Sequence, residues 1–239
     1  MPDSGTLPSF APSARSRVRR HHERGHYDRE TVFAILDSAL LCHVGYVIDG
    51  VPYVTPTLFW REGERLYWHG SSASRMLRRQ AVGLPVCVTV SHVDGLVLAR
   101  SAFHHSLNYR AVMAFGHAAI VTDPQEKEAR LNAFVERLYP GRTGLMRAIF
   151  PREIKATTLL SMVIEEASAK IRDDGPIDLE CDYETDCWAG VIPVAQLMRA
   201  PVGDWRVPPR GNREHEIGHF VEGVAFDKVL LSLARREIY

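Results

Sequence analysis

The stretch from Val51 to Gln80, VPYVTPTLFWREGERLYWHGSSASRMLRRQ, decides how this chain folds. It begins with two apolar, β-branched and aromatic runs separated by the polar turn 61–64, a pattern that predicts two neighbouring antiparallel strands. A loop rich in glycine and serine then opens a helix that carries Arg75, Arg78 and Arg79. The stretch therefore predicts a strand, a turn, a second strand, a loop and a helix.

The loop before this helix has the composition of an anion site. The first N–H groups of a helix lack intrahelical partners and lie at the positive end of its dipole, so a phosphate there meets donors already aimed at it. Gly70 allows a close backbone approach, and Arg75 adds a planar fork of N–H groups. Hydroxyl donors come from Ser71, Ser72 and Ser74. The alternative is a plain helix start, with Ser72 or Ser74 as the N-cap and the arginines facing solvent.

Strand signals continue on both sides of this stretch. Asp49-Gly50 separates the apolar runs 41–48 and 51–60, and this dipeptide between such runs predicts a tight hairpin. Asp94-Gly95 predicts a second hairpin in the same way. Further strands are expected in four regions: 65–69, 85–91 with 96–103, 111–121 and, as the last long strand, 158–165.

Two helices have clear start signals. Asp28 can cap a helix that reaches about Ala39, because apolar residues recur there at helical spacing. Asp123-Pro124 predicts a second helix that Pro140-Gly141 ends. Its expected inner face consists of Leu131, Phe134, Val135 and Leu138. Many antiparallel strands with helices at intervals indicate an α+β protein, mainly β, with a closed or nearly closed barrel.

Composition excludes several classes of function. Lys and Arg total 29 and Asp and Glu total 29, so no net field favours nucleic acid or an anionic membrane. No apolar run reaches the length of a membrane span, and residues 1–20 lack the apolar region of a signal peptide. We therefore expect a cytoplasmic protein that binds neither nucleic acid nor membranes. The four cysteines lack C-x-x-C spacing and are expected to be free thiols.

Several motifs occur in an order that resembles a known family. They are PYVTPTL (52–58), LYWHGSSASRML (66–77), CVTV (87–90), GLVLARSAFHHSLNYR (95–110) and WAGVIP (188–193). Together they resemble the flavin-nucleotide-binding branch of the pyridoxamine 5'-phosphate oxidase-like proteins, which includes the nitroimidazole-resistance reductases. The resemblance covers about residues 19–194. It implies an antiparallel Greek-key split β-barrel with peripheral helices, and a homodimer with FMN in each of two clefts at the subunit interface.

The resemblance also implies a division of the chain and a set of cofactor contacts. We expect a disordered leader (1–20), a split-barrel FMN-binding domain (21–194) and a C-terminal helical extension (195–239), in which Val224, Asp227, Lys228, Leu231 and Arg235 recur at helical spacing. The flavin ring edge would lie along Thr55, Pro56 and Thr57, and a proline inside a strand is itself typical of an edge. The phosphate and ribityl end would contact His69, Gly70, Ser72, Ser74, Arg75 and the backbone of Met76. The remaining implied contacts are Asn108, Tyr109, Arg110 and Trp188.

Histidines leave alternatives open. His69, at the end of a strand beside the expected flavin, could donate a proton to a substrate or be a structural histidine bonded to a carbonyl. The pair His104-His105 makes haem binding conceivable. His215-Glu216-Ile217-Gly218-His219 matches the H-E-x-x-H zinc motif, but Gly218 weakens a helix there, so a polar helix start is the expected interpretation.

The sequence therefore predicts an FMN-dependent oxidoreductase that passes electrons from reduced flavin to a small organic acceptor, such as a nitro compound or a quinone. One alternative is a non-catalytic protein that stores, carries or senses flavin or haem. A zinc hydrolase built on His215, Glu216 and His219 is the third hypothesis.

Overall fold

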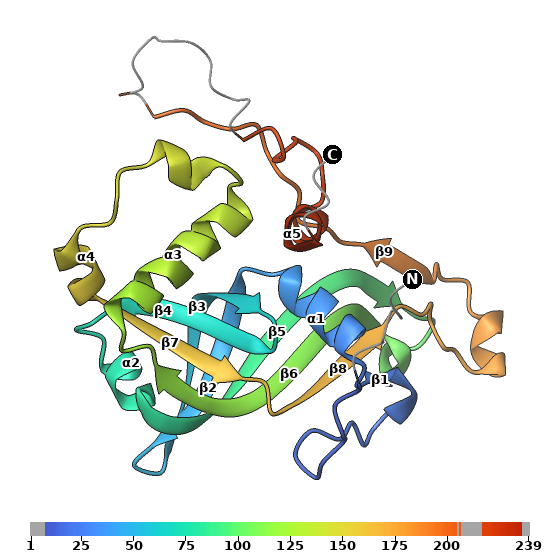
Figure 1. Cartoon of the computed structure of the whole chain (residues 1–239). Coiled ribbons are helices and arrows are strands. Elements are labelled where there is room, and N and C mark those ends of the chain that lie inside the picture. Colours follow the sequence, from blue (N-terminus) through green and yellow to red (C-terminus); the bar gives the residue numbers. More distant parts are fainter. Residues whose placement is uncertain (1–7, 205, 207–216, 236–239) are drawn as a thin grey trace, which may run out of the picture.

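The computed structural model describes residues 8–204, 206 and 217–235. Its strands lie in one sheet and its helices cover one side of that sheet and its ends (Figure 1). The strands are β1 (Gly25–His26), β2 (Leu41–Ile48), β3 (Val51–Glu62), β4 (Arg65–Ser71), β5 (Val82–Leu98), β6 (Ser106–Ile120), β7 (Thr157–Val163), β8 (Glu166–Arg172) and β9 (Gly190–Pro193). The α-helices are α1 (Arg29–Asp37), α2 (Arg75–Gln80), α3 (Pro124–Leu138), α4 (Pro151–Ala156) and α5 (Phe226–Arg235), and short 3-10 turns are η1 (His22–Arg24), η2 (Ala102–His104), η3 (Arg142–Leu145) and η4 (Glu180–Glu184).

The sheet closes on itself as a barrel. Its strand order is β1-β8-β6-β7-β4-β3-β2-β5-β9, and a further pairing joins β5 to β6. Six strands therefore form a ring, in the order β6, β7, β4, β3, β2 and β5, and neighbouring strands in this ring pair antiparallel. Strands β1, β8 and β9 extend the sheet beyond the ring. The predicted mainly β, α+β fold with an antiparallel barrel and peripheral helices is confirmed.

Local sequence signals account for the first half of the fold. The Asp28 side chain accepts a hydrogen bond from the Thr31 amide and begins α1 as predicted. Asp49 and Gly50 have φ angles of 52° and 78°, which are the left-handed values that a two-residue hairpin between β2 and β3 requires. The Asp123 carboxylate likewise caps α3. These three expectations are confirmed.

Three strand predictions in the second half are wrong. Strand β5 runs without a turn through Asp94-Gly95, where the register against β6 shifts and a bulge forms instead of a hairpin. Strand β6 begins at Ser106 and not at the predicted residue 111, so most of the polar residues 104–110 between the two expected strands lie in a strand. The run 158–165 is not the last long strand, because β8 follows it directly and pairs with β6.

The barrel interior forms the main core. Trp68 is fully buried there, and its indole N–H donates to the Gln80 side-chain oxygen of α2 at 3.0 Å. Burial also raises the pKa of the Cys42 thiol to about 12. A smaller cluster outside the barrel packs under α3 and consists of Trp60, Tyr67, Val121 and Leu159, with Leu131 and Phe134 against it. Three residues of the predicted inner face of α3 therefore do pack against the protein, namely Leu131, Phe134 and Leu138.

The two ends of the chain pack on this frame. The sequence predicts a disordered leader, but from Pro8 onward the structure shows a chain fixed to the sheet, with the Phe10 ring buried beside Phe33. In the C-terminal extension, α5 contains Asp227, Lys228, Leu231 and Arg235 of the set at helical spacing, and its buried residues are Val229, Leu230 and Leu233. Helix α5 lies against α1 and α3 (Figure 1). No helix in the described part of the chain is long and apolar enough to cross a membrane.

Candidate functional site

Strands β3 and β4 part in the middle of the predicted cofactor stretch. They pair only from Phe59 opposite Trp68 to Glu62 opposite Arg65. Residues 51–58 of β3 therefore pair with β2 on one side and have no strand on the other, while His69–Ser71 of β4 pair only with β7. The prediction that Pro56 lies at a strand edge is confirmed, because this part of β3 has a neighbouring strand on one side only. Proline is typical of such an edge. Two backbone edges face the place where the strands separate.

The side chains of the β3 segment point to different faces. Pro56 lies opposite His43 and is exposed, whereas Thr55 and Thr57 are half-buried. The Thr55 hydroxyl lies 3.0 Å from the Tyr46 hydroxyl. The Thr57 hydroxyl makes only a long contact of 3.4 Å with the Leu58 carbonyl. This segment can therefore offer free backbone groups at its edge and a hydroxyl group at Thr57.

On the other side of the split, α2 begins as a capped helix. The Ser74 hydroxyl accepts from the Leu77 amide at 3.5 Å, so the N-cap interpretation of Ser74 is correct. Gly70 packs closely against α2, and a Cβ there would lie 2.9 Å from a Leu77 methyl carbon, which would have to shift. Ser72 and Arg75 are exposed, and no side-chain hydrogen bond or ion pair of Arg75 exists within the described residues. Met76 is half-buried and packs against the core.

His69 lies apart from that exposed loop. Its ring lies beside the contacting pair of Trp60 and Phe134, with centroid distances of 6.0 and 6.4 Å to these two rings. Its Nδ1 atom is buried and has no hydrogen-bond partner in the described structure. Burial lowers the pKa of His69 below its ordinary value, so the ring is neutral at neutral pH. A neutral ring with an unused nitrogen is a poor proton donor and a good metal ligand.

The second predicted group of site residues is engaged in contacts of its own. Asn108 is buried and accepts a hydrogen bond from Arg172. Arg110 donates twice to Asp94, at 2.9 and 2.7 Å, and once to Asp227 of α5 at 2.8 Å. Within one chain these side chains therefore fix β6, the β5 bulge and α5 to one another. The sequence analysis missed this role, because Asp227 lies 117 residues from Arg110.

Tyr109 and Trp188 are more accessible. Tyr109 is half-buried and lies opposite Val93. Trp188 is 64% exposed, and its ring leaves no room for a Cβ at Gly190. In the chain as described, Trp188 therefore covers the start of β9 and shields no cavity. His104 packs edge-on against Phe103, and His105 hydrogen-bonds the Ser101 carbonyl.

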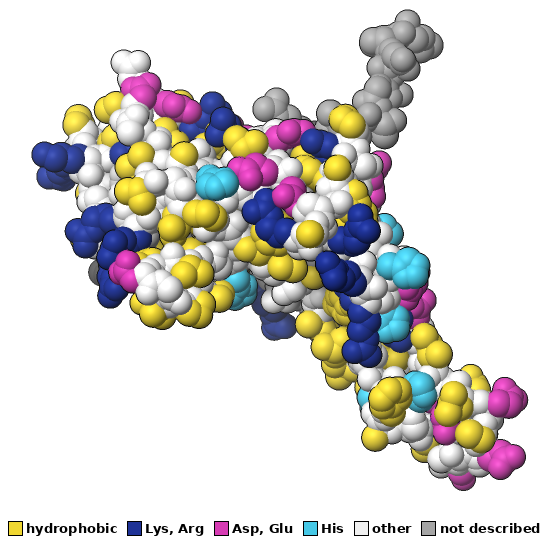
Figure 2. Space-filling model, turned by 90° about the horizontal axis from the view of Figure 1, so that it is seen from below, with side chains coloured by type: hydrophobic (Ala, Val, Ile, Leu, Met, Phe, Trp, Pro, Cys, Tyr) yellow, Lys and Arg dark blue, Asp and Glu magenta, His cyan; other side chains and the backbone are white. Residues whose placement is uncertain are grey.

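One face of the barrel is exposed and apolar. Cross-strand pairs place Pro56, His43, Thr89 and Met113 in one row across β3, β2, β5 and β6. Large apolar side chains on the same face remain open to solvent, namely Leu41 (57%), Val54 (68%), Leu58 (37%), Val93 (49%) and Met113 (45%). We call this surface the outer face. On the side of the molecule away from α3 and α5, Figure 2 shows many apolar side chains among basic ones. A surface of this kind is typical of an interface.

The zinc motif falls partly outside the described residues, because His215 and Glu216 are not among them. Ile217 begins a tight turn in which the Phe220 amide donates to its carbonyl, so the described half of the motif is not α-helical. The Nε2 atom of His219 lies 3.0 Å from the Leu138 carbonyl oxygen, which gives this ring a structural role.

Comparison with known proteins identifies relatives. The flavocytochrome Anf3 from Azotobacter vinelandii is 45% identical with a TM-score of 0.83, and the match covers 90% of this chain and all of that chain. The FAD and haem binding protein from Mycobacterium smegmatis is 33% identical with a TM-score of 0.79, over 83% of this chain and 98% of that one. No curated protein matches. The family profile described as pyridoxamine 5'-phosphate oxidase matches residues 28–171. With more than half of its length matched, the chain belongs to the pyridoxamine 5'-phosphate oxidase family.

Proposed function

We propose that this protein is a flavin-binding oxidoreductase whose flavin lies where β3 and β4 part. The observation that carries the proposal is the juxtaposition of an unpaired strand edge, residues 51–58, with the exposed loop and capped helix that follow His69–Ser71. A flavin needs hydrogen bonds to its polar ring edge and donors for its phosphate, and these two elements offer both kinds of group. The names of the two relatives support a flavin.

In this proposal the FMN moiety, alone or as half of FAD, is held by two groups of residues. The backbone edge at Thr55, Pro56 and Thr57 would bind the ring. Ser72, Arg75 and the first N–H groups of α2 would bind the phosphate, since Arg75 has no competing partner in the described structure. A bound flavin would supply one- and two-electron redox chemistry.

The same proposal makes the protein a homodimer. Apolar residues of the outer face, including Val54 and Leu58, adjoin the unpaired edge of β3, so a second copy packed there would also cover the flavin. Light scattering during gel filtration should then give a mass of about twice 26.9 kDa. A Val54→Asp variant should be a monomer that loses flavin on desalting, whereas a monomeric wild type with full flavin occupancy would refute a shared site.

The oxidoreductase part has a direct test. Protein that retains flavin after desalting should catalyse NADH- or NADPH-driven reduction of a quinone or a nitro compound, with the flavin bleached under anaerobic conditions and restored by the acceptor. Failure of every acceptor to reoxidise the reduced flavin would leave a flavin carrier and contradict the enzymatic proposal.

A second cofactor is supported by a separate observation, the buried and unpartnered Nδ1 of His69. Iron of a haem binds a neutral imidazole nitrogen, and burial keeps this ring neutral. The two relatives are named as a flavocytochrome and as an FAD and haem binding protein. We therefore propose that His69, and not the pair His104-His105, ligates a haem, which would supply one-electron redox chemistry.

The haem proposal is tested by absorbance and not by turnover. Protein expressed with haem available should show a Soret band. His69→Phe keeps a planar aromatic ring beside Trp60 and Phe134, so the variant should fold normally and lose the band. His104→Phe is the matched control and should keep it. Loss of the band in the His104 variant alone would contradict the assignment to His69 and favour His104-His105 as the haem ligands.

A further inference from the structure

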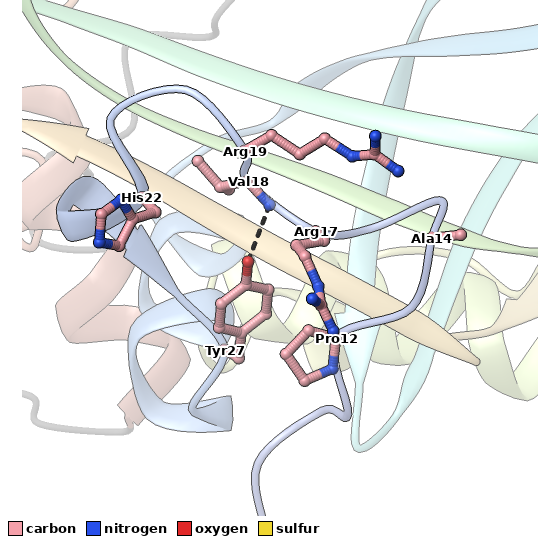
Figure 3. A pocket seen from close by; sticks show the side chains of 7 residues that line it. All are labelled: Pro12, Ala14, Arg17, Val18, Arg19, His22 and Tyr27. Atoms are coloured by element: carbon pink, nitrogen blue, oxygen red, sulfur yellow. Dashed lines mark hydrogen bonds between the residues drawn. The ribbon is translucent and has the colours of Figure 1, made fainter.

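The N-terminal segment before the matched family region forms a basic depression. Residues 8–27 precede the family match, which begins at residue 28. The depression has a volume of about 820 Å³ and is lined by Arg17, Arg19, His22 and Tyr27, together with small and apolar side chains (Figure 3). This volume lies within the usual range of small-molecule sites. None of its lining residues is acidic.

The segment is held in place by its own contacts. Arg15 donates to Glu166 of β8 at 2.6 Å, and its guanidinium lies over the Phe115 ring. The Val18 amide donates to the Tyr27 hydroxyl at 2.8 Å, a bond that Figure 3 shows. Lys170 of β8 donates to the Arg20 carbonyl at 3.1 Å. The depression is therefore a built feature of the fold, with walls anchored to β8.

Its two arginines differ from their neighbours in lacking partners. Other arginines near this end of the chain are paired, namely Arg15 with Glu166, Arg24 with Asp174 and Arg29 with Glu64. Within the described residues, the guanidinium groups of Arg17 and Arg19 make no hydrogen bond or ion pair. An acidic side chain close to the lining is that of Glu23, 3.8 Å from the His22 ring. The depression therefore carries uncompensated positive charge.

The chemistry of the lining selects a ligand class. Guanidinium forks bind phosphate oxygens in pairs, and two of them without carboxylate partners suit a group with more than one phosphate charge. The Tyr27 ring and the Pro12 and Val18 side chains provide an apolar wall for a ribose or a planar base. We propose that this depression binds the diphosphate of a nicotinamide dinucleotide.

The first test uses ADP, which contains the nucleoside diphosphate and no flavin. Calorimetric titration of the full chain should show ADP binding that falls at least 10-fold in the double variant Arg17→Gln/Arg19→Gln. Arg20→Gln is the matched control, because Arg20 is exposed in the same segment but does not line the depression. Absence of ADP binding in the wild type, or equal binding in the double variant, would overturn the proposal.

The source of the diphosphate is read from two further titrations. A 10-fold loss of FAD affinity, with FMN and nicotinamide dinucleotide affinities unchanged, would overturn this assignment and give the depression to the adenosine half of FAD. A loss of NADH and NADPH affinity with both flavins unchanged would assign it to the nicotinamide dinucleotide. Equal losses for FMN and FAD would overturn the proposal, since FMN has no diphosphate. If the flavin proposal alone fails, ADP binding and its dependence on the two arginines remain.

Discussion

Replacement of Arg75 by alanine tests the phosphate end of the proposed flavin site. Arg75 is the first residue of α2, directly after the N-cap Ser74, and it is exposed and unpaired in the described structure. A charge-assisted hydrogen bond to a phosphate contributes about 1.5 to 3 kcal/mol, which corresponds to about 10- to 150-fold in affinity. Water screens an exposed pair, so we expect the lower part of that range, about 10- to 30-fold.

The assay is a titration of apoprotein with FMN followed by flavin fluorescence, repeated with riboflavin, which has no phosphate. Arg75→Ala should weaken FMN binding by the stated factor and leave riboflavin binding unchanged. Arg65→Ala, an equal change of charge at the opposite end of β4, should alter neither affinity. Unchanged FMN affinity in the Arg75 variant, or an equal loss for riboflavin, would refute the placement of the phosphate at the start of α2.

Two further predictions concern the barrel itself. A Cβ at Gly116 would collide with the Val163 carbonyl oxygen and lie 2.7 Å from Met162 Cγ. Gly116→Ala should therefore lower the free energy of unfolding, measured by urea denaturation, by about 1 to 3 kcal/mol. Gly144→Ala is the control and should not lower it, because the space around Gly144 is open. Burial lowers the pKa of both His69 and His92 in the folded protein, so protonation favours unfolding. Stability should therefore fall as the pH drops from 7 to 5, and His69→Phe should reduce this dependence; a slope identical to wild type would contradict the assigned burial.

The turn at Asp49-Gly50 and the error at Asp94-Gly95 show what sequence can predict here. The first pair adopts the left-handed angles of a hairpin, as the local sequence signal between β2 and β3 predicts. The second pair lies where β9 joins the sheet, and Gly95 is needed because a Cβ would lie 2.9 Å from Val191 Cγ1. The same dipeptide thus forms a bulge under a contact made about 100 residues away, which local pattern cannot reveal.

The candidate site divides in the same way. The strand edge at Pro56 and the cap at Ser74 follow from local rules, because a proline lacks an N–H and a serine hydroxyl satisfies a free helix amide. The role of Arg110 depends on Asp227, which lies in a helix far along the chain. The unused nitrogen of His69 depends on the cover that α3 provides. Composition and spacing carry no information on either contact.

The fixed N-terminal segment was also outside the reach of sequence patterns. Residues 1–20 are rich in serine, proline and arginine, which is typical of a disordered leader. Phe10 nevertheless enters the core, and its amide donates to the Tyr27 carbonyl at 2.8 Å. The buried Phe10 ring and the contacts of Arg15, Val18 and Arg20 fix a segment whose average composition predicts no structure.

The central claim is that this chain holds a flavin where β3 and β4 part, and a visible absorbance spectrum tests it most directly. The spectrum is recorded on the protein as purified and again after incubation with FMN or FAD and desalting, with a Val54→Asp sample beside it. We predict flavin bands that survive desalting in the wild type and are lost in the variant. A wild-type protein that remains free of flavin absorbance after incubation with either flavin would contradict the account.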